Sequence, residues 1–349
     1  MIKYPKIGQF REVIRNVAHE TAYQGEDEDG NPIMDRTLPL PTLPYRGTVK
    51  LHGSNASVVI SKDAIVAQSR NRVLSVESDN AGFAMFALGV VGQDVWRELA
   101  TRLLLKEGET PGDDPVIIYG EWCGGNVQGG VALEKLPKMF VVFGVKIGPE
   151  DERRWVDIRP SGSLNLDDEK IYSIYDERFP VYDLDINFES PELSRNKMIE
   201  ITIAVEECCP VGKALGAEGI GEGVVWSCAS PGLNNPGYWF KVKGEKHSAS
   251  KVKTLAPVDI ELVKSVNEFV DRTLTENRCN QGIEYLKEHG LELTQKSTGE
   301  FIKWIVGDCI REELDTLVES GLDGKAVAKP LGGAARDWFF SYLKKTLGF

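Results

Sequence analysis

The chain lacks any apolar run near the roughly 18 residues that would cross a membrane. Its first residues, MIKYPKIGQF, also lack the apolar core of a secretory signal peptide. Internal repeats and low-complexity segments are absent as well. We therefore expect a soluble, cytoplasmic protein with no membrane partner.

Cysteine is scarce and scattered. The six cysteines form no C-x-x-C pair, which argues against a disulfide framework and against a zinc site. The adjacent Cys208 and Cys209 fall in a segment that we expect to be helical, with no second pair at a useful spacing. The order G-x-x-x-x-G-K-[ST] of a phosphate-binding loop is also missing, because the glycines of GKALGAEGIGEG lead into a predicted strand.

Positive charge is in short supply. The chain has 41 Lys and Arg against 53 Asp and Glu, a net charge of −12, which counts against a nucleic-acid partner. The local distribution differs from the total, because residues 241–253, KVKGEKHSASKVK, hold five lysines and one acidic residue. This segment is either a solvated strand and loop or a patch that follows a phosphate backbone.

The chain of 349 residues has the composition of a globular protein, with 42% hydrophobic and 27% charged residues. Residues 1–46 begin with a helical pattern and continue into an acidic, proline-rich stretch at 24–44, which we expect to be a surface loop. Residues 47–147 alternate short β-rich runs with one amphipathic segment near 83–105. Helical periodicity fills residues 258–349. We predict two domains, 1–256 and 257–349.

The stretch GTVKLHGSNASVVI, residues 47–60, places a lysine inside an apparent strand. Because side chains alternate along a strand, Lys50 and His52 would face away from the core that Val49 and Leu51 enter. A glycine directly after His52 permits a tight turn, which would bring Asn55 near the same pocket. The lysine is either a surface residue on an edge strand or a nucleophile.

Three later segments share this form, a β-rich run ending in charged residues beside glycine. They place Glu121 in VIIYGEWCGG, Glu222 before GVVW, and Lys241 and Lys243 on one face of YWFKVKGEK. A nucleophilic lysine must be unprotonated, so its pKa must fall from about 10.4. Neighbouring cations and desolvation both lower it, and the two later lysines would supply the positive charge.

The series KLHGSN, SRNR, YGEW, VVFGVKI, EGVVW and FKVK resembles, in this order, the motifs of the covalent nucleotidyltransferases, the polynucleotide ligases and mRNA capping enzymes. The K-x-H-G-x-N form is similar to the RNA ligase 2-like branch of ATP-dependent RNA ligases. The resemblance spans about residues 47–247. It implies an α+β domain of twisted antiparallel sheets with flanking helices, followed by an all-helical C-terminal domain instead of the OB-fold of DNA ligases and capping enzymes.

The resemblance also implies roles for single residues. Lys50 would be the nucleophile, His52 and Asn55 would orient phosphates or metal-bound water, and Arg70 would contact the nucleotide and the 5′-phosphate end. Glu121 would bind the ribose hydroxyl, and Phe143 would stack on adenine. Glu222 would bind a divalent metal, and Lys241 and Lys243 would bind the α-phosphate. Each residue type suits its role: a flat ring for a base, a carboxylate for a sugar or Mg²⁺, and lysines for charge on phosphorus.

Plainer interpretations stand beside these roles. In isolation, Phe143 is more often a core residue, and Glu121 and Glu222 are strand-end carboxylates. Arg70 competes with Arg72 in SRNR and is selected only by its spacing from Lys50. The chain departs from the pattern at one position, because a glycine follows Phe143 where relatives commonly carry an acidic residue.

The implied activity is ATP-dependent RNA ligation through lysyl-AMP, with Mg²⁺ or Mn²⁺, on RNA with 5′-phosphate and 3′-hydroxyl ends in repair or nick sealing. We expect a monomer. The alternatives are a DNA ligase, a capping-type enzyme, a non-catalytic RNA-binding protein on a ligase fold, and an enzyme that transfers AMP to a protein. In the helical domain, the cations that we predict to contact RNA are Arg278, Arg336, Lys344 and Lys345, whereas core positions are predicted for Trp338, Phe339 and Phe340.

Overall fold

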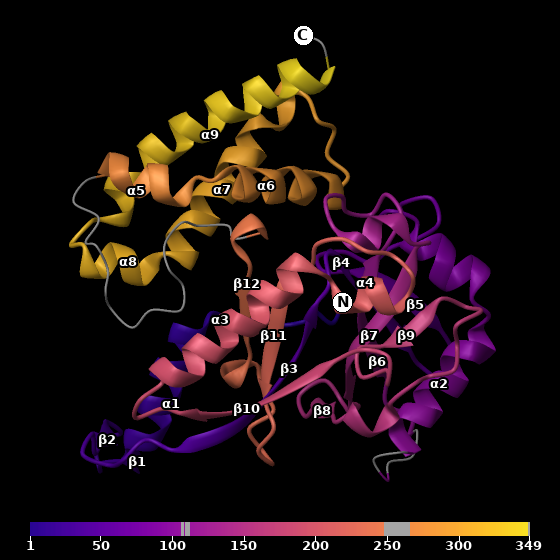
Figure 1. The fold of residues 1–349 in the computed structure, drawn as a ribbon, viewed down its shortest axis with the longest axis horizontal. Helices are drawn as coiled ribbons and strands as arrows, with labels where there is room; N and C mark the ends of the chain where they lie inside the picture. Colours follow the sequence, from indigo (N-terminus) through magenta and orange to yellow (C-terminus); the bar gives the residue numbers. More distant parts are fainter. Residues whose placement is uncertain (106–107, 109–111, 248–265, 348–349) are drawn as a thin grey trace. The chain divides into compact units, whose positions relative to one another are not determined.

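The computed structural model describes residues 1–105, 108, 112–247 and 266–347. The chain divides into two compact units, Met1–Gly244 and Glu245–Phe349 (Figure 1). The first unit mixes antiparallel sheets with helices and the second is helical throughout its described part, so the predicted fold class is confirmed. The predicted domain boundary after residue 256 lies outside the described residues.

The first unit contains two main sheets and a small hairpin. Its elements are α1 (Phe10–Ala22), β1 (Tyr23–Glu26), β2 (Pro32–Met34), β3 (Thr42–Lys50), β4 (Gly53–Ile60), β5 (Ile65–Ser69), η1 (Met85–Val90), α2 (Gln93–Leu105), β6 (Val116–Cys123), η2 (Ala132–Lys135), β7 (Met139–Ile147), β8 (Arg154–Val156), η3 (Arg159–Ser161), β9 (Ile171–Ser173), β10 (Val181–Asn187), α3 (Glu192–Glu207), α4 (Pro210–Ala214), β11 (Gly223–Cys228), η4 (Pro236–Tyr238) and β12 (Phe240–Lys243).

The strand orders show that segments far apart in sequence lie side by side. One sheet has the order β10-β3-β11-β12, with antiparallel neighbours throughout. The other has the order β5-β4-β6-β7-β8, also antiparallel, with the short β9 parallel to β7. The strands β1 and β2 form a separate hairpin within the stretch that the sequence predicted to be a loop.

Strand alternation gives the four-stranded sheet two different faces. Buried Tyr45, Val49 and Phe240 lie on the face that α1 covers, where the rings of Phe10 and Phe240 are 4.8 Å apart. The helix α3 packs against β10, β11 and β12. The alternate residues therefore point to the opposite face; among them are Thr48, Lys50, Val225, Lys241 and Lys243.

The six-stranded sheet buries one face under α2. The helix contributes Trp96 and Leu103 to a core that includes Val58, Ile118 and Phe140 of β4, β6 and β7. The opposite face of β4 and β6 carries the alternate residues, which include the register pair Asn55 and Glu121.

The predicted helix near 83–105 is two elements. The π-helix η1 ends at Val90, and α2 begins at Gln93 after a break at Val91 and Gly92. The Trp96 indole N–H donates to the Ala87 carbonyl oxygen at 2.9 Å, which satisfies a backbone group of the π-helix. Periodicity alone favours one continuous helix over this segment. The break instead allows aromatic residues on both sides of it to be buried.

The prediction that Cys208 and Cys209 lie within a helix is wrong. Cys208 follows the last residue of α3, and Cys209 precedes α4, where its sulfur accepts from the Gly212 N–H. Pro210 occupies the first position of α4, where a missing N–H costs nothing, so the chain starts a new helix there.

The second unit has its own apolar core. Its described elements are η5 (Glu245–His247), α5 (Val266–Thr273), α6 (Glu276–Glu288), η6 (Gln295–Ser297), α7 (Thr298–Glu312), α8 (Leu314–Glu319) and α9 (Gly324–Leu347). The rings of Phe301 and Phe339 stack at 4.5 Å within this core, and Trp338 packs against it. Phe339 is thus a core residue as predicted, whereas Phe340 is 42% exposed and the core prediction for it is wrong.

Candidate active site

A cavity of about 230 Å³ is lined by β3, β11 and β12 of one sheet and by β6, β7 and β8 of the other. Seven of the nine predicted site residues line it: Lys50, Asn55, Arg70, Glu121, Phe143, Lys241 and Lys243. The remaining two, His52 and Glu222, make direct contacts with each other, and Glu222 also contacts Lys50. The sequence therefore identified residues that the fold brings to one place.

Glu222 is the centre of this group. One of its carboxylate oxygens, Oε2, lies 2.7 Å from the Lys50 Nζ and 3.1 Å from the His52 Nδ1. The other oxygen, Oε1, lies 2.7 Å from the Lys243 Nζ. The pairing of Gly223 with Lys50 on one side and with Lys243 on the other explains this geometry, because β11 runs between β3 and β12.

Two opposing effects act on the pKa of Glu222. Burial disfavours the carboxylate and would raise the pKa, since the side chain is only 2% exposed. Lys243, then Lys50, and then the hydrogen bond from His52 stabilise the charged form and hold the pKa well below its usual value. Glu222 is therefore ionised at neutral pH, and the cations around it are what make its burial possible.

Glu121 of β6 is paired with Asn55 of the neighbouring strand β4, and both side chains line the cavity. Burial raises the pKa of Glu121; Lys50 and Arg70 oppose this rise, while Glu222 adds to it. The carboxyl groups of Glu222 and the partly buried Glu121 therefore differ, because Glu222 has direct ion pairs and Glu121 has more distant cations.

Phe143 lines the cavity and lies at an irregularity in β7. The register passes from Tyr119 opposite Gly144 to Gly120 opposite Val142, which leaves Phe143 as the extra residue of a β-bulge. A bulge changes the direction of side chains along a strand. Val142 enters the core under α2, so alternation turns Phe143 to the cavity. The bulge then shifts the alternation, so that Gly144 also lines the cavity and Val145 enters the core.

The structure distinguishes Arg70 from Arg72. The Arg72 guanidinium donates to the Ser78 carbonyl and hydroxyl oxygens at 3.1 and 2.7 Å and to the Asp79 carbonyl oxygen at 2.7 Å. These bonds hold the loop that follows β5. Arg70 lines the cavity instead and acts electrostatically on Glu121.

A glycine is needed after His52 for a different reason than the predicted turn. Gly53 begins β4, and its φ lies outside the left-handed region. A Cβ atom there would stand 2.3 Å from the Trp122 carbonyl oxygen and 2.8 Å from the Cys123 Cβ. Close approach of β4 to β6 therefore requires the glycine.

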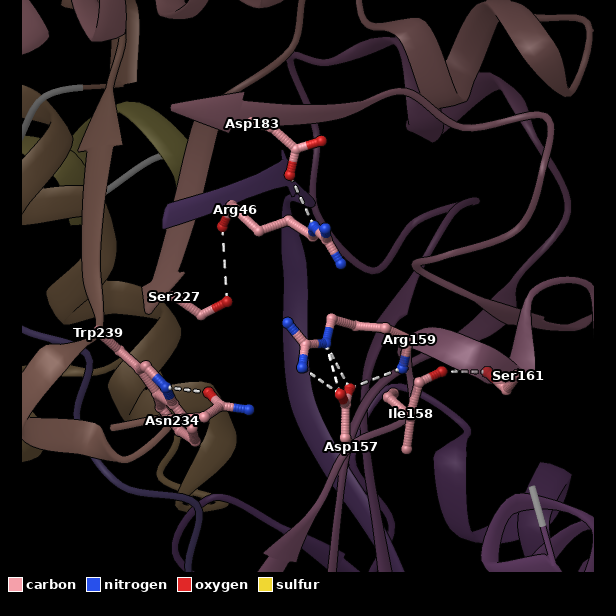
Figure 2. A network of polar contacts seen from close by, with 9 residues as sticks. All are labelled: Arg46, Asp157, Ile158, Arg159, Ser161, Asp183, Ser227, Asn234 and Trp239. Atoms are coloured by element: carbon pink, nitrogen blue, oxygen red, sulfur yellow. Dashed lines mark hydrogen bonds and ion pairs between the residues drawn. The ribbon is translucent and has the colours of Figure 1, made fainter. Parts of the chain in front are cut away.

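The cavity extends along β3 and β11 away from Lys50. Ser227 is opposite Arg46, four positions before Lys50, so this part lies about 13 Å away along the strand. Figure 2 shows the polar contacts around it: the Arg46 Nε donates to Asp183 at 2.8 Å, Arg159 pairs with Asp157, and the Trp239 indole N–H donates to the Asn234 Oδ1 at 2.8 Å.

Several lining residues escaped the sequence analysis. They are Tyr4, Thr48, Trp155, Tyr175, Ser227, Asn234 and Trp239. Strand alternation from Lys50 could have identified Thr48, and register with β3 could have identified Ser227. The aromatic residues carry no such signal, because Tyr4 precedes α1, Tyr175 and Trp239 come from connections, and Trp155 lies in the short edge strand β8.

The donor set at Glu222 suits a metal ion that arrives with phosphate. Within the described ranges, no cluster of three or more His, Cys, Asp or Glu side chains is arranged to hold a metal ion. Mg²⁺ is commonly bound by one or two carboxylates together with substrate phosphates. Glu222 supplies one carboxylate, and two lysines already contact it. Phosphate oxygens would therefore have to supply the remaining ligands of the metal ion.

The four cations of the second unit that the sequence predicted to contact RNA differ in their exposure to solvent. Arg278 is 1% exposed and forms an ion pair with Glu313 at 3.3 Å, so its prediction as an RNA contact is wrong. Arg336, Lys344 and Lys345 are exposed. Of the lysine-rich segment 241–253, residues 248–253 lie outside the described part of the chain. The described residues contain no helix long and apolar enough to span a bilayer.

Comparison with known proteins adds the following. No curated protein sequence matches the chain. Among solved structures, Naegleria gruberi RNA ligase with PPi aligns at 17% identity and a TM-score of 0.35, over 70% of this chain and 56% of that chain. Two mutants of that enzyme, one with ATP and Mn and one with AMP and Mn, align at 15% and 16% identity with TM-scores of 0.39 and 0.37, over the same shares. The chain thus spans little more than half the length of these similar structures.

The sequence profile of a family described as RNA ligase matches residues 43–243. This range begins at the second residue of β3 and ends at the last residue of β12, so it contains both main sheets. It also contains Lys50, Glu222 and Lys243, which meet beside the cavity. Since the profile covers more than half of the 349 residues, the chain belongs to the RNA ligase family.

Proposed function

We propose that the protein is an ATP-dependent RNA ligase that joins 3′-hydroxyl and 5′-phosphate ends through a lysyl-AMP intermediate on Lys50. The observation that carries this proposal is the position of Lys50, which lines the cavity and shares the Glu222 carboxylate with Lys243. Membership of the RNA ligase family supports the reaction class. The K-x-H-G-x-N form favours the RNA ligase 2-like branch.

The Glu222 carboxylate marks where anionic oxygens are stable in this site. Its two oxygens lie between the Lys50 and Lys243 ammonium groups, each at 2.7 Å. An α-phosphate that displaced the carboxylate would meet the same two cations, and Lys241 lines the cavity beside them. Lysines in such positions stabilise the charge that develops on phosphorus.

The first step needs Lys50 in a different state from its ion pair. An ammonium has no lone pair, so Lys50 must separate from Glu222 and lose a proton before it attacks. The amine then forms an N–P bond to the α-phosphorus while the P–O bond to pyrophosphate breaks, and an amine proton passes to solvent.

The cavity suits the nucleoside part of ATP. Its volume of about 230 Å³ is below the roughly 300–1,000 Å³ of sites that enclose whole drug-sized ligands. We assign Phe143 to the base, by stacking, and Glu121 to a ribose hydroxyl. The phosphates would then lie at Lys50, Lys241 and Lys243, where Arg70 and Asn55 also line the cavity.

Two further steps complete the reaction. A 5′-phosphate oxygen of the RNA attacks the lysyl-AMP phosphorus, the N–P bond breaks, and Lys50 returns as the amine. The 3′-hydroxyl oxygen then attacks the 5′-phosphate, its proton is lost, and AMP leaves. A divalent cation, Mg²⁺ or Mn²⁺, would supply charge neutralisation for the leaving groups, with Glu222 as its protein ligand. A role in RNA repair or nick sealing suits this activity.

The test is covalent labelling. The purified protein is incubated with Mg²⁺ or Mn²⁺ and ATP labelled at the α-phosphate, denatured, and mapped by mass spectrometry. We expect one labelled site, Lys50, and its loss in Lys50→Ala and in Lys50→Arg, because a guanidinium does not lose its proton in proteins. The matched control is Lys62→Ala, whose exposed side chain lies in the turn after β4.

Other outcomes would select the alternatives. Labelling of the Lys50→Ala variant would refute the nucleophile. Labelling by GTP in place of ATP would indicate a capping-type enzyme, and AMP transfer to DNA ends or to a protein in place of RNA would change the acceptor. A folded protein, free of bound AMP, that no nucleotide labels would favour a non-catalytic RNA-binding function.

A further inference from the structure

Residues 2–9, here called the strap, connect the two sheets beside the cavity. At one end, the Ile2 N–H donates to the Gln68 Oε1 at 3.2 Å, and the Ile2 carbonyl oxygen accepts from the Tyr119 hydroxyl at 3.3 Å. Both partners belong to the six-stranded sheet. At the other end, Gly8 pairs with β12 and its carbonyl oxygen accepts from the Lys241 N–H at 3.1 Å.

Tyr4 lies midway along the strap and enters the aromatic wall of the cavity. Its ring centroid is 4.9 Å from that of Phe143, at an interplanar angle of 63°. It is also 5.5 Å from Trp155 of β8 and stacks at 5.8 Å on Trp239, which precedes β12. The Tyr4 ring therefore touches aromatic residues that belong to both sides of the cavity.

Phe143 needs such a support because of its place in the bulge. A bulged residue lies outside the regular ladder, so neighbouring pleats do not fix its direction. Tyr4 supplies a ring contact to Phe143 from within the cavity wall. At 63° the contact between the two rings is edge-to-face in type, and not a parallel stack.

The Tyr4 hydroxyl interacts electrostatically with polar residues that line the same cavity. Burial raises the pKa of Tyr4 strongly, Tyr175 adds to this rise, and Arg70 opposes it. Tyr4 is therefore neutral at physiological pH. Arg70 and Tyr175 line the cavity together with Tyr4, which places the whole side chain at the nucleotide site.

We propose that Tyr4 is a positioning residue for the nucleotide: its ring holds Phe143 in the orientation that stacks on the base, and the strap holds Tyr4 there. This inference rests on the proposed function, which assigns Phe143 to the base. The strap's bond to the Lys241 N–H links the same segment to the strand that bears the phosphate-binding lysines.

The experiment compares ATP binding in four full-length proteins: wild type, Tyr4→Ala, Tyr4→Phe and Tyr23→Ala. Tyr23 is a matched control, because it is an exposed tyrosine of β1 in the same unit. Calorimetry gives the Kd of ATP, and the rate of Lys50 labelling at rising ATP concentration gives KM and the maximal rate. Thermal unfolding monitors folding of each variant.

We expect Tyr4→Ala to raise the Kd and the KM by about five- to ten-fold, as loss of an aromatic pair predicts. The maximal rate at saturating ATP should change less than about two-fold, since Lys50 is untouched. Tyr4→Phe keeps the ring and should restore most of the affinity, and Tyr23→Ala should bind as wild type.

A folded Tyr4→Ala protein with the wild-type Kd would overturn the proposal, and so would a Tyr4→Phe protein that loses as much affinity as Tyr4→Ala. If Tyr4→Ala unfolds, Tyr4→Leu keeps the volume without the ring, and a wild-type Kd there overturns the proposal equally. Wild-type protein that binds ATP without labelling Lys50 refutes the proposed chemistry alone, and the Kd comparison still decides the role of Tyr4. Wild-type protein that binds no ATP refutes both.

Discussion

At the residue scale, Glu222 sets the state of the site before any nucleotide binds. Its carboxylate contacts Lys50, Lys243 and His52, and it is nearly inaccessible to solvent. A buried carboxylate without these partners would be strongly destabilising. The reverse also holds, because Lys50 and Lys243 converge on one point and would repel each other without Glu222.

Replacing Glu222 with Gln should therefore lower the free energy of unfolding by roughly 2 kcal/mol at pH 7. This is less than the ~3–5 kcal/mol of a broken, fully buried pair, because the Lys50 and Lys243 side chains remain 21% and 19% exposed. Urea unfolding of Glu222→Gln and wild type measures the difference. Glu218→Gln, the same change at an exposed position nearby, should stay within about 0.5 kcal/mol.

The same comparison has a defined pH dependence. The pKa of Glu222 is lower in the folded protein than its ordinary value of 4.5, so the carboxylate contributes its full stability above about pH 4.5. That contribution disappears as the pH falls through the folded-state pKa. The gap in unfolding free energy between wild type and Glu222→Gln should therefore narrow as the pH falls below about 4.5. A gap independent of pH would mean that the loss at pH 7 comes from packing.

At the element scale, alternation of side chains in the sequence predicts the strands that bear the site, but it does not predict the irregularities within them. Val49 and Leu51 are buried, as the sequence predicted, and Lys50 and His52 both contact Glu222. The bulge at Phe143 breaks the alternation of β7, and nothing local in VVFGVKI encodes it. It depends on pairing with β6, a strand that is distant in sequence.

Other incorrect predictions of secondary structure have similar causes. The amphipathic pattern of 83–105 is real on both sides of Gly92, so the sequence alone favours one helix where the fold makes two. The acidic stretch at 24–44 contains turn residues that suit a loop or a hairpin equally, and only its pairing decides. Tyr4 reached the site with no motif at all, because its place depends on hydrogen bonds to both sheets.

Gly53 offers a test of the strand geometry next to Lys50. In Gly53→Ala, the new Cβ would meet the Trp122 carbonyl oxygen at 2.3 Å, so β4 must move away from β6. We expect a loss of about 1–3 kcal/mol in unfolding free energy and a slower labelling of Lys50, because His52 and Lys50 directly precede the clash. Gly92→Ala, where a Cβ meets nothing within 4 Å, is the control. Unchanged stability of Gly53→Ala would show that β4 pairs with β6 less closely at this point.

At the scale of the whole molecule, the division into two compact units separates the proposed chemistry from the helical unit. Every residue that lines the cavity lies between Tyr4 and Lys243, within the first unit. The second unit has its own core and its own buried ion pairs. Lysyl-AMP formation should therefore depend on the first unit alone.

Arg278→Ala should test this independence of the first unit in the full-length protein. Arg278 pairs with Glu313 at 3.3 Å and with Asp308 at 3.8 Å, and Glu313 is completely buried. Removing the arginine leaves the buried Glu313 carboxylate without this cation, whereas Asp308 keeps its ion pair with Arg311. The loss should be about 3–5 kcal/mol within a domain stability of only about 5–15 kcal/mol. Hydrogen exchange should show faster opening of α6, α7 and α9, while labelling of Lys50 by ATP stays close to wild type. Arg336→Ala, at an exposed site of α9 beside Asp337, should change neither readout. If Arg278→Ala abolished the labelling of Lys50, the helical unit would be required for the first step, and the independence of the two units in catalysis would be refuted.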